Sequence, residues 1–208
     1  MSIPDIARQM LDGGQGSHDW DHTLRVVRLC NHIGRIESAD MAVLIPAAYL
    51  HDIGRQKQDE SGGVVCHAEY GAALAEPVIR DMPVTDHQKT NILHCIRAHR
   101  FRSANRPETL EAKVLFDADK LDAIGAIGVA RAFLFAGEIG AKLHSPDVAL
   151  ENSRPYTADD TGYREYQVKL RHIRDRILTR EGKKLAQARH GFMTDFFQQF
   201  LQEYEGNR

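Results

Sequence analysis

The sequence predicts an all-α protein, and three observations support this prediction. Apolar residues recur at the three- and four-residue spacing of amphipathic helices along almost the whole chain. Alternation with a period of two, which is typical of a half-buried strand, is hard to find. The 208 residues are 42% hydrophobic and 27% charged, an ordinary composition for one sizeable core. We therefore expect a single helical domain over residues 1–208.

Charge and cysteine content exclude several classes of protein. The 27 Lys and Arg residues nearly balance 29 Asp and Glu residues, so no net basic field would recruit a long nucleic acid. The odd number of cysteines, Cys30, Cys66 and Cys95, argues against a disulfide framework and favours a reducing cytoplasm. No apolar run reaches the roughly 18 residues of a membrane span, so we expect no membrane partner.

The first expected helix covers residues 21–36. Asp21 can cap its amino-terminal end, and its buried stripe includes Val26. His22 lies one turn before Val26 on the same stripe. We therefore expect the His22 imidazole to point inward.

The second expected helix runs from residue 40 to residue 51, and Gly54 is placed to end it. This puts the adjacent pair His51 and Asp52 at a carboxyl-terminal helix end. Residues 56–65 are expected to form a loop because of their polar and glycine-containing composition. Such a loop could cover a site.

Helices are also expected from residue 67 to about residue 80 and from residue 85 to residue 99. His99 continues the apolar stripe of the second of these helices. It is therefore a second imidazole that should point inward.

A long helix is expected from residue 111 to about residue 135. Asp119 and Asp122 lie on its apolar stripe, where carboxylates would be costly to bury without a cation or several hydrogen-bond donors. The glycine-containing run at 125–128 lowers helix propensity but permits another helix to approach closely. A metal ion would explain why carboxylates occupy this stripe.

The carboxyl-terminal part is expected to contain an irregular connection over residues 137–163 and two amphipathic helices, 163–178 and 181–204. We expect these helices to pack on a metal-binding core formed by about residues 17–135. The last helix should bury Leu185, Phe192, Met193, Phe196, Phe197 and Phe200. This aromatic-rich helix could equally serve a homodimer.

Four residues of metal-ligand type fall on inward helical faces or at an inward helix end. They are His22, His51, Asp52 and Asp119. Two imidazoles and two carboxylates suit one divalent ion of intermediate hardness and leave coordination positions for water and a substrate oxygen. A phosphate ester is the substrate class that fits this chemistry.

Residues 114–128 also allow two other interpretations. Residues 114–119 look like the strand and Asp-x-Asp motif of haloacid-dehalogenase-type phosphatases, in which Asp117 would be the nucleophile. Lys120 and Leu121 depart from that pattern, and alternating strands and helices are lacking around it. An EF-hand counted from Asp117 fails because Gly128 takes the position of the required Glu.

Several segments resemble a bacterial subgroup of small, stand-alone proteins of the HD-domain superfamily of metal-dependent phosphohydrolases. The segments are SHDWDHTLRV (17–26), HDIGR (51–55), HAEYG (67–71), EAKVLFDADKLDAIGAIGVAR (111–131) and ARHGFMTDF (188–196). The resemblance covers most of the chain. It implies a helical bundle around a mononuclear metal site with His22, His51, Asp52 and Asp119 as the ligands.

Some HD relatives hold two metal ions through extra histidines, and His67, His94 and His99 are available here. His94 and His99 are five residues apart and point to different sides of one helix. We favour one tightly bound ion, with His67 and His99 as substrate-side or proton-handling groups. Manganese or magnesium is the preferred ion, although iron, cobalt, nickel and zinc also suit the donors.

The remaining roles follow from the needs of a phosphoryl-transfer transition state. The candidate catalytic residues are Asp52, Asp119, His67 and Lys120. The candidate substrate-binding residues are His18, His99, Arg131 and Asp122. Lys120 is equally well explained as a solvated helix lysine and Arg131 as half of a structural ion pair.

The resemblance implies hydrolysis of phosphate or pyrophosphate bonds in nucleotides, with a small phosphorylated substrate. The alternative is a non-catalytic helical bundle in which a metal ion is a structural staple and a nucleotide or protein binds. A structural site usually has four protein ligands and needs no polar groups beside it, so the additional histidines favour an enzyme.

Overall fold

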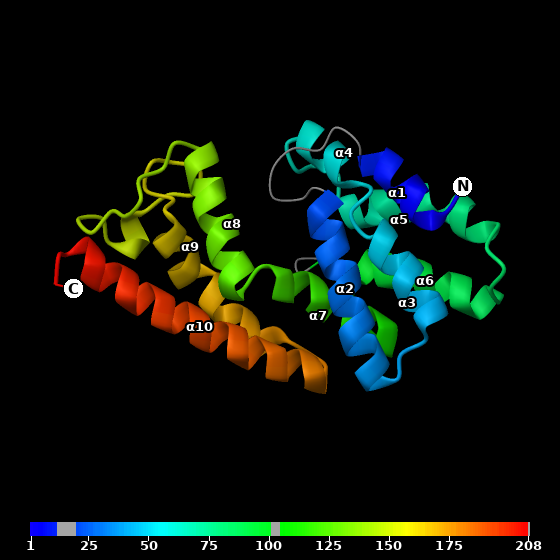
Figure 1. Ribbon diagram of the computed structural model, residues 1–208. Helices are drawn as coiled ribbons and strands as arrows, with labels where there is room; N and C mark the ends of the chain where they lie inside the picture. Colours follow the sequence, from blue (N-terminus) through cyan, green and yellow to red (C-terminus); the bar gives the residue numbers. More distant parts are fainter. Residues whose placement is uncertain (12–19, 101–104, 208) are drawn as a thin grey trace. The chain divides into compact units, whose positions relative to one another are not determined.

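The structure, a computed structural model, describes residues 1–11, 20–100 and 105–207. These residues form helices and turns without a strand, which confirms the prediction of an all-α protein (Figure 1). The chain divides into two compact units. Unit 1 comprises Met1–Asp119 and Leu178–Gly182, and unit 2 comprises Lys120–Ile177 and Lys183–Arg208.

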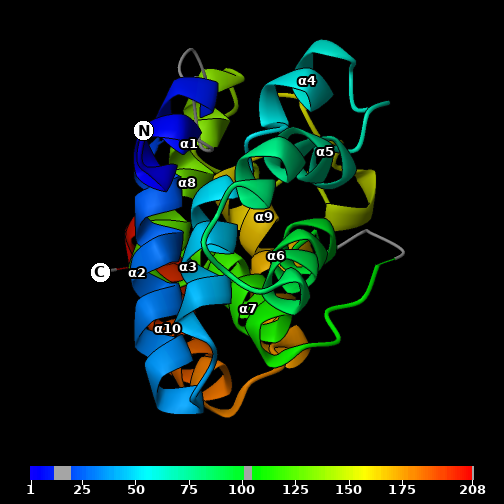
Figure 2. The same ribbon diagram turned by 90° about the vertical axis from the view of Figure 1, so that its right-hand side faces the viewer.

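Unit 1 is organised around helix α3. Its helices are α1 (Ile3–Leu11), α2 (Trp20–Glu37), α3 (Met41–Leu50), α4 (Arg55–Glu60), α5 (His67–Arg80), α6 (Asp86–Ala98) and most of α7 (Leu110–Asp122). Helix α3 contacts α1, α2, α5 and α6 (Figure 2). It is apolar on nearly every side, and such a helix is stable where neighbours surround it.

Local signals start two helices where the sequence indicates. The Asp40 side chain accepts a hydrogen bond from Ala42 N at 2.9 Å and caps α3. Thr85 and Gln88 form a capping box at the start of α6. These short-range contacts fix where α3 and α6 begin, and therefore which of their residues face the core.

Two expectations for unit 1 are corrected. Helix α1 was not expected, and helix α4 occupies the first part of the expected loop over 56–65. Helix α4 has six residues, none of them buried. It lacks the apolar stripe by which the longer helices were found, and this explains why composition alone suggested a loop.

The expected long helix over 111–135 is in fact two helices. Helix α7 ends at Asp122, and α8 begins at Gly125 and ends at Glu138. Ile124 between them is extended, with φ −130° and ψ 167°, and Gly125 has φ +78°. A left-handed backbone angle suits glycine, so this position allows the chain to turn between the helices.

Unit 2 has an aromatic core. Its further elements are the 3-10 turn η1 (Leu150–Asn152), α9 (Gly162–Val168), the 3-10 helix η2 (Leu170–Arg176) and most of α10 (Arg180–Tyr204). The rings of Tyr166 on α9 and Phe197 on α10 stack with centroids 4.4 Å apart, and Phe133 on α8 lies 6.2 Å from Phe197. Phe192, which was expected to be buried, is 46% exposed.

The expected helix over 163–178 is also interrupted. Lys169 has φ −138° and ψ −60°, outside the helical region, and the chain continues as a 3-10 helix. The apolar spacing that suggested one helix survives because Leu170 and Ile173 are buried in the 3-10 segment. The apolar pattern therefore placed the buried side correctly but not the backbone conformation.

The segment Leu178–Gly182 is attached to unit 1 through Asp117 of α7. Asp117 is fully buried, and its carboxylate accepts hydrogen bonds from Leu178 N at 2.8 Å, Thr179 N at 2.7 Å and Thr179 Oγ1 at 2.6 Å. Thr179 Oγ1 in turn accepts from Gly182 N at 3.1 Å. These bonds hold the start of α10 against α7.

Candidate metal centre

The four predicted metal ligands come from three parts of unit 1. His22 is on α2 and Asp119 is on α7, while His51 is the C-cap of α3 and Asp52 follows it in a turn. His22, His51 and Asp52 are each no more than 1% exposed. The Asp119 side chain is 14% exposed. The site is therefore nearly closed, and Asp119 is the most accessible of the four predicted ligands.

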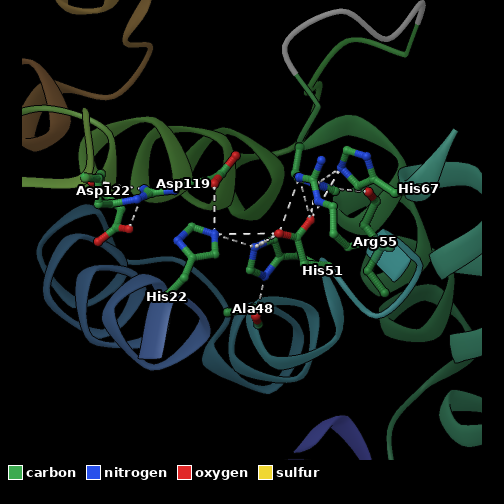
Figure 3. Close-up of polar contacts among 11 residues, drawn as sticks. His22, Ala48, His51, Arg55, His67, Asp119 and Asp122 are labelled. Carbon is green, nitrogen blue, oxygen red and sulfur yellow. Dashed lines mark hydrogen bonds and ion pairs between the residues drawn. The ribbon is translucent and has the colours of Figure 1, made fainter. Parts of the chain in front are cut away.

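The ligand atoms of His22, His51 and Asp52 lie within 4.8 Å of one another, and Asp119 joins this first group through its contact with His22 (Figure 3). His22 Nε2 lies 3.4 Å from His51 Nε2, 3.4 Å from Asp119 Oδ1 and 3.7 Å from Asp52 Oδ2. His51 Nε2 is also 3.7 Å from Asp52 Oδ2. Atoms about 2.1 Å from a shared ion lie roughly 3.0–3.4 Å from one another, so these spacings approach those of a coordination shell.

A second group is built on the other oxygen of Asp52. Asp52 Oδ1 lies 3.4 Å from His67 Nε2 and 3.5 Å from His99 Nε2, and those two nitrogens are 3.0 Å apart. His67 is 3% exposed and His99 1%. The second group, Asp52, His67 and His99, thus shares one carboxylate with the first group.

Hydrogen bonds orient three of the imidazoles. In each ring Nδ1 contacts an oxygen that can only accept: His51 contacts Ala48 O at 2.8 Å, His99 contacts Ile96 O at 2.6 Å, and His67 contacts Gln58 Oε1 at 2.8 Å. Nδ1 therefore carries the hydrogen, and Nε2 of a neutral ring has a bare lone pair. In all three rings this lone pair is on the nitrogen nearest Asp52.

Burial keeps two of these rings neutral. Removal from water lowers the pKa of His51 from 6.5 to about 4, although Asp52 acts in the opposite direction. Burial likewise lowers the pKa of His67 from 6.5 to about 2. Neutral imidazole is the form that binds a metal ion.

The arrangement of lone pairs fits a cation. His67 Nε2 and His99 Nε2 face each other at 3.0 Å, and both lie within 3.5 Å of Asp52 Oδ1. A cation among these three atoms would be coordinated by all of them. Imidazole nitrogen and carboxylate oxygen together suit divalent ions of intermediate hardness.

Comparison with known proteins identifies the family of this chain. Residues 19–124 match the family model described as HD domain. The chain is also 30% identical to YpgQ of Bacillus subtilis over 203 residues, which are 96% of this chain and 90% of YpgQ. The chain is an HD-domain protein.

Solved structures similar to this HD-domain protein extend the likeness. The crystal structure of Bacillus subtilis YpgQ in complex with ADP is 29% identical, with a TM-score of 0.74, and the match covers 97% of this chain and 92% of that one. An HD-superfamily hydrolase from Bacillus thuringiensis is 26% identical, with a TM-score of 0.77 and coverage of 98% and 95%. The HD-domain protein therefore belongs among HD-superfamily hydrolases.

The other predicted site residues that the structure of this HD-domain protein describes are not part of the two histidine and aspartate groups. In unit 2, Asp122 Oδ2 accepts a hydrogen bond from Arg131 Nη1 at 2.8 Å, so Arg131 forms an ion pair as its alternative interpretation required. A substrate role for Arg131, Asp122 or Lys120 stays a prediction. His18 lies outside the described residues.

In none of the described helices is there an apolar stretch long enough to cross a bilayer.

The structure of unit 1 decides two questions that the sequence raised, namely whether Asp117 is a nucleophile and whether His94 and His99 face the same ion. Asp117 lies on a helix rather than after a strand, and its carboxylate is occupied by three donors, which is incompatible with a role as nucleophile. His94 accepts a hydrogen bond from Glu108 N at 3.1 Å, whereas His99 faces Asp52. The two histidines point to different sides, as their spacing indicated.

Sequence reasoning missed two residues of the centre. Arg55 Nη2 lies 3.2 Å from Asp52 Oδ1 and 3.4 Å from Oδ2. Gln58 orients His67. Arg55 follows Asp52 by three residues, and that spacing within one turn could have suggested the contact. No comparable signal identifies Gln58, because its partner is nine residues away and the intervening segment was expected to be a loop.

Proposed function

We propose that this HD-domain protein is a metal-dependent phosphohydrolase that cleaves phosphate or pyrophosphate bonds of nucleotides. The cluster of His22, His51 and Asp52, with Asp119 in contact with His22, carries the proposal. A solved relative, YpgQ, was crystallised in complex with ADP, which supports a nucleotide as the substrate class. Manganese or magnesium is the proposed ion, and the proposed setting is the cytoplasm.

Each ligand has a defined task in this scheme. His22 and His51 supply neutral nitrogen donors, and Asp52 and Asp119 supply anionic oxygens that can also accept a hydrogen bond from the attacking water and so orient it. A bound divalent ion supplies Lewis acidity, which lowers the pKa of water and offsets charge on phosphoryl oxygens. The carboxylate of Asp119, being the most accessible ligand, is our candidate for orienting the water.

The second group offers a place for a second metal ion. We therefore propose to test whether the protein binds one ion or two. His67 and His99 would hold the further ion with Asp52 as the bridge, which accounts for the close approach of their Nε2 atoms to each other and to Asp52. The sequence favoured one ion, with His67 and His99 as substrate-side or proton-handling groups. With a pKa of about 2, His67 is uncharged at neutral pH, so it cannot attract phosphate as a cation.

The test combines turnover with metal analysis. Wild-type protein and Asp119→Ala are loaded with Mn²⁺ or Mg²⁺ and supplied with nucleoside mono-, di- and triphosphates, cyclic nucleotides and guanosine tetraphosphate. Loss of the Asp119 carboxylate should lower kcat/KM by about 10³-fold or more, because the water and the ion both lose a ligand. Ions per chain are counted by mass spectrometry of the metals.

The control is His87→Ala, because His87 is exposed on α6 and should leave turnover and metal content unchanged. A count of two ions in wild-type protein, reduced in His67→Gln, would establish the second group as a metal site. Undiminished turnover by Asp119→Ala with unchanged metal content would refute the assignment. A tightly held ion without turnover of any substrate would indicate the structural staple.

A further inference from the structure

Arg55 occupies an unusual position at the metal centre. It is the first residue of α4, a short helix without buried residues, yet its side chain is only 19% exposed and lies on the Asp52 carboxylate. The contact involves Nη2, at 3.2 Å from Asp52 Oδ1 and 3.4 Å from Oδ2. Its Nε is buried and has no hydrogen-bond partner among the residues that the structure describes.

The charge of the centre changes when a metal ion binds. Without an ion, Asp52 is a buried carboxylate, and Arg55 is a cation in contact with both of its oxygens. The two carboxylates of the first group carry two negative charges, and one divalent ion neutralises both of them. The guanidinium of Arg55 then retains a positive charge that the ligands no longer balance. An anion is needed next to it.

A phosphate group has the chemistry to satisfy this guanidinium. Arginine presents five N–H donors in a planar fork that binds two phosphate oxygens at once. The contact with Asp52 uses one terminal nitrogen at marginal distances, and the buried Nε donor is not satisfied. A phosphoryl group next to Asp52 would lie within reach of the remaining donors. Lys57 on the same helix is different, because its side chain is 49% exposed and pairs with Glu60 at 3.5 Å.

We propose that Arg55 binds the phosphoryl group of the substrate, and that it exchanges Asp52 for phosphate as its principal partner when the metal ion is bound. This inference rests on the proposed function, since it assumes a phosphate-containing ligand. Arg55 thus has two states, as a counter-ion of Asp52 in the metal-free protein and as a phosphate ligand in the loaded protein.

The inference is tested by binding rather than by turnover alone. Calorimetry measures the affinity of metal-loaded wild-type, Arg55→Met, Arg55→Lys and Lys57→Met proteins for inorganic phosphate. Removing the charged donors of Arg55 should weaken phosphate binding by about 10- to 100-fold. Arg55→Lys should recover part of the loss, because it restores the charge but not the planar fork. Lys57→Met is the matched control and should bind phosphate as the wild type does.

Metal affinity separates a phosphate ligand from a structural clamp on Asp52. Arg55→Met should bind Mn²⁺ as tightly as wild-type protein or more tightly, because a cation that competes for Asp52 has been removed. A tenfold weaker Mn²⁺ affinity in Arg55→Met would overturn the inference. So would unchanged phosphate affinity in that variant, or a wild-type protein that does not bind phosphate. Arg55-dependent phosphate binding without hydrolysis of any nucleotide would support the inference and contradict the proposed function.

Discussion

Asp117 and Asp119 lie two residues apart on α7 and have different surroundings. Asp117 accepts three hydrogen bonds from Leu178 and Thr179, whereas Asp119 lies 3.4 Å from the His22 nitrogen. Both are carboxylates on one helix, so their residue type does not separate a structural role from a ligand role. Their partners separate them, and those of Asp117 are more than 60 residues away in the sequence.

The hydrogen bonds of Asp117 predict a stability effect. In Asp117→Asn the amide offers one acceptor oxygen, and its NH₂ group faces a donor instead of accepting from it. We expect the free energy of unfolding to fall by about 2–4 kcal/mol, because hydrogen bonds to a buried charge are lost and a donor is left unsatisfied. Urea unfolding measures the change.

Asp195→Asn is the matched control, because Asp195 is exposed on α10. It should stay within about 0.5 kcal/mol of the wild type. If Asp117→Asn were as stable as this control, the three hydrogen bonds would not hold Leu178–Gly182 in solution.

Among the elements, the turn between α3 and α4 is in close contact with α5. A Cβ atom on Gly54 would lie 2.3 Å from His67 O and 2.7 Å from Gly71 N, both of which are backbone atoms. A Cβ atom on Gly71 would in turn lie 3.3 Å from Gly54 N. This contact between backbones sets the separation between Asp52, in the turn, and His67, at the start of α5.

Gly54→Ala should therefore move the turn away from α5. We expect a loss of about 1–3 kcal/mol in the free energy of unfolding, because the clashing atoms belong to the backbone and cannot rotate away. The variant should also bind fewer ions or bind them more weakly. Unfolding in urea and metal analysis of the same samples measure both effects.

Gly191→Ala provides the comparison, because a Cβ atom there meets nothing within 4 Å and the residue is helical. It should be neutral or slightly stabilising. Equal stability and metal content in the Gly54 and Gly191 variants would show that the close approach of the turn to α5 is unimportant.

The sequence predicted most helices but not all of their boundaries. Caps such as Thr85 act over a few residues and can be found in the sequence. The break between α7 and α8 at Gly125 could not be found in the sequence, because the apolar spacing continues through it. Only the positive φ of Gly125 reveals the turn. For the site, the sequence allowed us to predict which residues have side chains of metal-ligand type and which of these side chains point inward. The bridging of both groups by Asp52 depends on how α5 and α6 pack, which no local pattern specifies.

At the scale of the whole molecule, buried neutral histidines make stability depend on pH. The pKa of His51 falls from 6.5 to about 4 on burial, and that of His67 to about 2. Below pH 6.5 the unfolded chain binds protons on these rings and the folded chain does not. Unfolding then takes up protons, so the stability that is fully present above this range is lost as the pH falls.

We therefore expect the free energy of unfolding of metal-free protein to fall between pH 7.5 and pH 5.5. Each of the two histidines contributes a slope of at most about 1.4 kcal/mol per pH unit. Urea unfolding at several pH values in the presence of a chelator measures this slope. His67→Gln should reduce it, and a stability that is flat or rises toward pH 5.5 would contradict the expectation.

The attachment of Leu178–Gly182 to unit 1 also affects the order of folding during synthesis. Asp117 emerges from the ribosome 62 residues before Thr179, one of its hydrogen-bond donors. Until Thr179 follows, the carboxylate must remain hydrated, and α7 cannot settle into its final buried position. A nascent chain stalled before that point would carry Asp119 on a helix that is not yet fixed. The metal centre can therefore mature only after Thr179 has left the ribosome.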